Sequence, residues 1–250
     1  MRKSDKSVLQ LCIAVFCSLL FSCLSHGNIL VQTGFEGDDV GSIPQDPEDA
    51  WQASGAGFEV SSDVVKEGGK SLAMVGGGGN QALGVSFDTS SNVITAEFWL
   101  YIDGVERSLT VFVQEPNSGL TDWAASGPYL NWIGDGARHY PGAWEDIGEF
   151  TSGEWHYIRL VVDLGASSYD IYLGDTVGEA HAGTPIGKDL GFRAAIAPPP
   201  GKVVFGTYDL TTPAYVDDLL IYEGNVLPEG IFAVAPEGKL ASTWGEVKKR

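Results

Sequence analysis

The feature that most constrains the fold is a series of short runs in which apolar and polar residues alternate, each bounded by Gly, Asp, Asn or Pro. The clearest runs cover residues 95–103, 108–113, 155–163, 169–173, 202–206 and 214–222. A period of two is typical of strands, and no stretch after residue 27 keeps a helical apolar pattern beyond two turns. Short strands separated by turns favour a sandwich or a barrel. We therefore predict an all-β fold, either a sandwich or a barrel.

The first 27 residues have a different character. Basic residues precede an apolar run from Val8 to Leu24, and small residues follow at Ser25 and Gly27. This pattern predicts a secretory signal peptide over residues 1–27, because the run is shorter than the roughly 20 residues of a membrane span. An alternative is that Cys23 is acylated and becomes the mature N-terminus, because residues 20–23 resemble a bacterial lipoprotein box. Phe21 fits this box poorly. Both alternatives predict an exported protein, secreted or associated with the cell envelope.

The positions of the cysteines argue against cysteine chemistry in the mature protein. All three cysteines, Cys12, Cys17 and Cys23, lie in the predicted signal segment. A chain cleaved after Gly27 would have no disulfide, no thiolate catalyst and no Cys-ligated metal. The remaining residues are enough for one domain held together by its core.

The charge balance excludes one class of partner. The formal net charge is −18, from 15 Lys and Arg against 33 Asp and Glu. Such a chain repels nucleic acid, because phosphate contacts need cations. The acidity is explained either by solubility outside the cell or by binding of Ca²⁺.

The C-terminal segment is predicted to lie outside the main domain. Residues 225–236 are linker-like, and residues 238–250 contain the capping-box pair Thr243 and Glu246 followed by a basic end. We predict a short helix there, outside the sandwich. The alternatives are a frayed terminus or a tag for sorting or attachment.

The strand motifs resemble a known superfamily. Residues 94–102, 153–163, 169–174 and 215–222 follow the order found in laminin-G-like members of the concanavalin A-like lectin/glucanase superfamily. Residues 34–39, Trp51 and residues 67–72 resemble the opening of secreted carbohydrate-binding modules. The resemblance implies a two-sheet antiparallel jelly-roll sandwich over residues 28–224, and it concerns architecture more than activity.

Carboxylates at the two ends of this domain are candidate metal ligands. Glu36, Asp38 and Asp39 follow the first expected strand, and Asp217 and Asp218 lie on the last one. The resemblance implies adjacent terminal strands and a structural Ca²⁺ held partly by Glu36 and Asp217, with Asp38 as a third candidate. The alternative is solvated, turn-forming acids. Zinc is not expected, because the histidines show no ligand spacing.

An aromatic stretch is the candidate saccharide site. Aromatic rings stack on pyranose rings, and Asn and Asp hydrogen-bond to hydroxyl groups. The Gly-rich stretch that we expect to connect strands contains suitable residues: Trp123, Asn131, Trp132, Asp135, Tyr140 and Trp144. The alternative is that these aromatic side chains fill the core.

Catalytic motifs are not evident. Hydrolases of this superfamily use Glu-x-Asp-x-Glu on one strand, and residues 145–149 have the residue types at the wrong spacing. The lyase motifs and a Gly-x-Ser-x-Gly elbow are also missing. We therefore predict a non-catalytic binding or adhesion module for extracellular carbohydrate. The alternatives are a divergent polysaccharide hydrolase or lyase, or a structural protein of the envelope or matrix.

Overall fold

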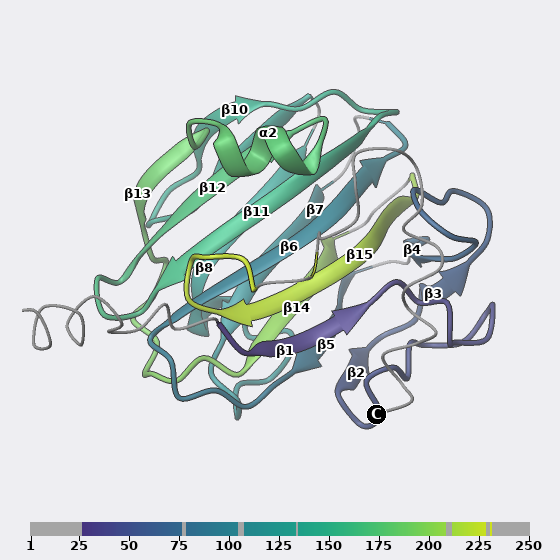
Figure 1. The fold of residues 1–250 in the computed structure, drawn as a ribbon, viewed down its shortest axis with the longest axis horizontal. Coiled ribbons are helices and arrows are strands. Elements are labelled where there is room, and N and C mark those ends of the chain that lie inside the picture. The colour runs from purple at the N-terminus through teal and green to yellow at the C-terminus, as the bar shows by residue number, and fades with distance from the viewer. Residues whose placement is uncertain are drawn as a thin grey trace, which may run out of the picture.

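The protein is a sandwich of two antiparallel sheets (Figure 1), seen in a computed structural model that describes residues 27–76, 79–104, 108–133, 135–208, 212–228 and 231. Sheet I has the order β13 (Gly187–Gly191), β12 (Ser168–Gly174), β11 (Trp155–Asp163), β6 (Val93–Ile102), β15 (Ala214–Glu223), β4 (Ser71–Met74) and β3 (Phe58–Ser61), and β1 (Ile29–Thr33) also pairs with β15. Sheet II has the order β10 (Glu145–Glu149), β9 (Gly136–His139), β8 (Ser126–Ile133), β7 (Ser108–Gln114), β14 (Lys202–Tyr208), β5 (Asn80–Ser86) and β2 (Trp51–Ser54).

The alternating runs form strands as predicted. The run expected over residues 155–163 is β11, and the other runs correspond to β6, β7, β12, β14 and β15. Strand β6 illustrates why alternating runs form strands: its even-numbered residues from Ile94 to Ile102 are apolar and lie in the core between the sheets. Facing them from sheet II is Phe205, whose ring meets that of Phe98 edge-on at 5.4 Å between centroids. The shared core fixes which face of each strand points inward.

The stretch from Trp123 to Trp144 differs from the prediction. It is not a connection but includes β8 and β9, which pair with each other and extend sheet II. Gly127 and Pro128 obscured β8, because both residues usually interrupt strands. Here they lie where the β7–β8 register shifts between Phe112 and Gln114, and a bulge of this kind tolerates proline.

The helical content is small. The α-helix among the described residues is α2 (Val177–Ala182), and it crosses the outer face of sheet I over β11 and β12 (Figure 1). Its first turn has a capping box in which Thr176 and Glu179 satisfy each other's backbone amides. Residues 1–26 of the predicted signal segment (residues 1–27) lie outside the described residues, as does the predicted helix over residues 238–250. No helix in the described part of the chain is long and apolar enough to cross a membrane.

The outer face of sheet II is partly covered by two segments. The first includes η1 (Trp123–Ala125) and Leu120, which packs so closely on β5 that a Cβ at Gly84 would lie 2.6 Å from it. The second is the loop after β13, where Ile196 would lie 2.9 Å from a Cβ at Gly127. Between these coverings the sheet surface stays open, and this opening positions the candidate site.

Candidate functional site

A pocket of about 320 Å³ opens on the outer face of sheet II. Its volume lies at the small end of the range for ligand sites, which suits a short saccharide segment. Its walls come from β5, β7, β8, β9, β14, η1, the β9–β10 connection and the loop after β13. The lining residues are Asn80, Thr110, Trp123, Tyr129, Asn131, Ile133, Arg138, Trp144, Arg193 and Tyr208.

Strand alternation explains which side chains reach the pocket. On β8, Leu130 and Trp132 belong to the core, whereas Tyr129 and Asn131 lie on the opposite face and line the pocket. Trp132 is 1% exposed. Its side chain therefore fills the interior and is not part of the predicted saccharide platform. The physical reason is that adjacent residues on a strand point to opposite faces.

The indole of Trp123 forms one wall. A Cβ at Gly206 of β14 would lie 2.5 Å from this ring, so glycine is needed for the ring to rest on the strand backbone. The ring also packs against Phe112 and Tyr129, with centroids 5.2 and 6.0 Å away. These contacts hold Trp123 in place before any ligand binds.

Trp144 forms the accessible wall. It is 40% exposed, and its ring packs against Tyr129 and Tyr140 at centroid distances of 5.4 and 5.1 Å. An exposed indole that packs against other rings offers apolar surface to a sugar ring.

Polar groups in the pocket are held by short networks. Asn131 Nδ2 donates to the Leu109 carbonyl at 3.2 Å, and Asn131 Oδ1 accepts from Arg138 Nη2 at 3.0 Å. The guanidinium of Arg138 also lies 5.0 Å from the Trp144 ring centroid. The guanidinium of Arg193 lies 4.7 Å from the ring of Tyr129 and 4.6 Å from that of Tyr140.

The structure brings together some of the predicted saccharide residues. Trp123, Asn131 and Trp144 line the pocket, and Tyr140 packs behind Trp144. Asp135 is exposed in the β8–β9 turn, where it accepts from Ser152 at 3.3 Å, and it does not line the pocket. Tyr129, which shares the outward face of β8 with Asn131, lines the pocket but was not among the predicted residues. Arg193 was not predicted either, because it comes from a distant loop without a local sequence signal.

The catalytic candidates lie elsewhere. Glu145, Asp146 and Glu149 are exposed on the edge strand β10, and none of them lines the pocket. His156 has both ring nitrogens engaged, Nδ1 with Asp175 at 3.2 Å and Nε2 with the Thr151 carbonyl at 3.0 Å. No Asp or Glu of the described chain lines the pocket, so it offers no carboxylate pair for glycoside hydrolysis.

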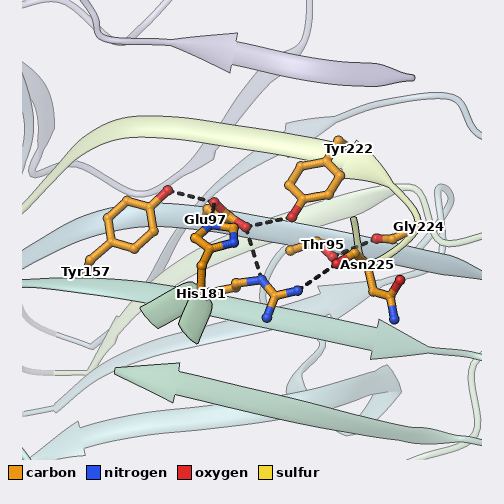
Figure 2. Close-up of polar contacts among 8 residues, drawn as sticks. Thr95, Glu97, Tyr157, His181, Tyr222, Gly224 and Asn225 are labelled. Atoms are coloured by element: carbon orange, nitrogen blue, oxygen red, sulfur yellow. Dashed lines mark hydrogen bonds and ion pairs between the residues drawn. The ribbon is translucent and has the colours of Figure 1, made fainter. Parts of the chain in front are cut away.

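A second polar cluster lies under α2 on sheet I. Glu97 of β6 is 0% exposed, and Figure 2 shows its carboxylate between the hydroxyls of Tyr157 and Tyr222, which donate at 2.7 and 2.6 Å. His181 of α2 contacts the carboxylate at 3.0 Å, and Arg159 Nε forms an ion pair with it at 3.2 Å.

Several bonds extend this cluster toward the end of the chain. Arg159 donates to the Asn225 carbonyl at 2.7 Å, and Thr95 donates to the Gly224 carbonyl at 2.6 Å. Burial alone raises the pKa of Glu97, but the bonds from His181, Tyr222 and Tyr157 outweigh it and lower the pKa. Glu97 therefore stays ionised. Because it is enclosed by its partners, we assign the cluster to stability, fastening α2 and residues 224–225 to the sheet.

The predicted metal ligands lie at one end of sheet I. β1 pairs with β15, as the prediction of adjacent terminal strands requires. Asp217 Oδ2 accepts from the Lys66 and Glu67 amides, and Glu36 Oε1 accepts from the Gly69 and Lys70 amides. Asp38 accepts from other amides, those of residues 45 and 46.

The charges at this end are only partly balanced. The Lys70 ammonium bonds to the Glu36 and Asp38 carbonyls. Burial and the nearby charge of Glu36 raise the pKa of Asp217 to about 6, and burial with the charge of Asp217 raises that of Asp218 to about 7. In the described part of the chain no three Asp, Glu, His or Cys groups converge enough to hold a metal ion. Calcium binding stays a prediction.

The fold is similar to that of several solved structures. No protein-family model matches the sequence, and no curated protein matches it significantly. A sialidase aligns with a TM-score of 0.53 and 14% identity over 79% of this chain, although this chain covers only 19% of the sialidase. A conserved carbohydrate esterase from Shiga toxin-encoding bacteriophage phi24B aligns with a TM-score of 0.53 and 17% identity, over 80% of this chain and all of the esterase chain.

A third structure extends the comparison. It was reported with the endo-acting O-glycanases that human gut microbiota express to initiate mucin breakdown, and it aligns with a TM-score of 0.51 and 12% identity. The alignment covers 79% of this chain and all of the other. At such low identity the likeness concerns the fold alone. The chain therefore has the concanavalin A-like lectin/glucanase β-sandwich fold.

Proposed function

We propose that the protein is an exported, non-catalytic module that binds carbohydrate in the pocket on sheet II. One observation carries the proposal: an exposed, ring-supported Trp144 faces a pocket whose other walls are aromatic rings and hydrogen-bonding side chains. Rings bind the apolar faces of pyranoses, and polar side chains of the pocket lining can bond to hydroxyl groups. Because no carboxylate lines the pocket in the described chain, binding is favoured over hydrolysis.

Two further facts support a carbohydrate role. The structural neighbours described above include a sialidase, a carbohydrate esterase and a structure reported with endo-acting O-glycanases. The amino-terminal segment has the pattern of an export signal, which would bring the pocket to extracellular glycans.

Replacing Trp144 by alanine tests the proposal. The purified chain from residue 28 onward is first applied to a glycan array, and the affinity for the strongest glycan is then measured by calorimetry. We expect Trp144→Ala to weaken binding about 10- to 100-fold, because the stacking surface is lost. The melting temperature should change little, because this side chain is exposed.

Trp155→Ala is the matched control, because Trp155 is a half-buried tryptophan on the outer face of sheet I. It should leave affinity unchanged. An array without binding, measured on folded protein, would contradict the proposal. Release of reducing ends or unsaturated sugars from a bound polysaccharide would contradict the non-catalytic part of it.

We also propose a structural calcium ion near Glu36 and Asp217. The proposal is supported by the raised pKa values of Asp217 and Asp218, since a divalent cation would relieve the repulsion between these buried acids. The carboxylates would have to move together from their amide-bonded positions. We expect Ca²⁺ to raise the melting temperature above its value in chelator, and Asp217→Asn to abolish this difference. A wild-type protein with the same melting temperature in both conditions would contradict calcium binding.

A further inference from the structure

The pocket on sheet II is positively charged in a strongly acidic protein. The whole chain has 15 Lys and Arg against 33 Asp and Glu. Two of those cations, Arg138 and Arg193, line this pocket, and no acidic residue of the described chain does. The local charge is therefore opposite to that of the molecule as a whole.

Neither arginine forms an ion pair with a carboxylate among the residues that the structure describes. Asp146 is the residue opposite Arg138 across the β9–β10 pair, yet no ion pair joins them. Arg138 donates to the neutral amide of Asn131, and its buried Nε has no hydrogen-bond partner in the described part of the chain. Arg193 likewise forms no ion pair with a described carboxylate. Both residues are only partly exposed, so water screens their charges incompletely.

Aromatic rings hold the two guanidinium groups instead. Arg193 lies over the rings of both Tyr129 and Tyr140, and Arg138 lies over Trp144. Burial raises the pKa of Tyr129, although the charge of Arg193 and a side-chain hydrogen bond from it oppose this, so the phenol stays neutral and provides no counter-ion. Stacking on a ring engages the face of a guanidinium and leaves N–H groups at its edge to bond. An anionic oxygen pair is the ligand that such an edge binds best.

We infer that the saccharide bound in this pocket is anionic, and that its carboxylate or sulfate group is recognised by Arg138 and Arg193 while its ring stacks on Trp144. The inference rests on the proposed function and specifies its ligand class. Uronic acids, sialic acids and sulfated sugars share the required chemistry, which is a planar or tetrahedral anion attached to a pyranose ring.

The acidity of the rest of the surface makes this recognition selective. A net charge of −18 repels polyanions from other surfaces, so non-specific binding should be weak. Salt screens that long-range repulsion more strongly than it screens contacts within a partly buried pocket. Binding of an anionic glycan should therefore lose little affinity as salt rises, unlike binding to a basic patch.

A glycan array with paired ligands tests the inference. Each uronate-containing oligosaccharide is printed beside its methyl ester, and each sialylated or sulfated glycan beside the same glycan without the anionic group. We expect binding to the charged member of a pair to be at least 10-fold stronger. The sulfate and carboxylate sets distinguish the two sources of charge.

Arginine variants then locate the effect. Arg138→Gln and Arg193→Gln should each weaken binding of the charged ligand about 10- to 100-fold, and Arg193→Lys should retain part of the affinity. Lys188→Gln is the matched control, because it removes one positive charge from an exposed position on β13 of the other sheet. A thermal melt of each variant confirms that it is folded.

The outcomes separate the two proposals. Binding to neutral and charged partners with equal affinity, or to neutral glycans alone, would overturn the anionic inference and leave the carbohydrate proposal standing. Unchanged affinity of both glutamine variants for a charged glycan would also overturn it. An array without any binding would contradict the carbohydrate proposal itself.

Discussion

We expect Glu97→Gln to lower the free energy of unfolding by about 3–5 kcal/mol, because removing one partner of a buried ion pair leaves the other charge uncompensated. The remaining charge would be that of Arg159, which is itself 8% exposed. The hydroxyls of Tyr157 and Tyr222 would also lose an anionic acceptor. Urea denaturation at neutral pH measures the change. Glu149→Gln, an exposed carboxylate on β10, should stay within about 0.5 kcal/mol of the wild type.

The pH dependence of this difference identifies its origin. The pKa of Glu97 is lower in the folded chain than its usual value of about 4.3 in the unfolded one. A lowered pKa stabilises the fold at pH values above the unfolded pKa, and this contribution is lost as pH falls through the folded pKa. The difference between wild type and Glu97→Gln should therefore be present above about pH 5 and shrink below about pH 4. A difference that is independent of pH would contradict an ionised Glu97.

The strands could be predicted wherever alternation was uninterrupted. β11 has the predicted bounds, and β6 differs by no more than two residues at either end, since its inward residues are apolar without exception. β8 could not be found, because Gly127 and Pro128 suggest a turn, and a bulge that accommodates them depends on the neighbouring strand. The helix α2 was missed although Thr176 and Glu179 form a capping box that the sequence displays.

The candidate site could be predicted only in part, because its residues depend on register. Composition pointed to the stretch from Trp123 to Trp144, but the inward Trp132 follows directly after the outward Asn131, and a one-residue change of register reverses both. Arg193 is brought to the pocket by long-range packing, in which the backbone amide of Arg193 donates to the Gly127 carbonyl. Glu97 is buried because α2 and residues 224–225 cover the outer face of the sheet. The alternation of residues on β6 shows only that this face is polar and aromatic, and it does not show that the face is covered.

Trp132 and Trp144 should respond to substitution in opposite ways. Trp132→Ala is expected to lower the free energy of unfolding by about 3–5 kcal/mol, because it leaves a cavity between the sheets where the indole is 1% exposed. Trp132→Phe should cost less and keep glycan affinity, since it retains most of the buried ring and does not touch the pocket. Urea denaturation and calorimetric titration of the same preparations separate stability from binding.

The comparison with Trp144→Ala makes the assignment of faces testable. If alternation on β8 is as described, Trp132 variants lose stability in proportion to the volume removed, whereas Trp144→Ala loses affinity and keeps its stability. A folded Trp132→Ala with wild-type stability and no glycan binding would show that its ring faces the ligand. That result would reverse the inward and outward sets of β8, and Asn131 would then belong to the core, where its amide would need new hydrogen-bond partners.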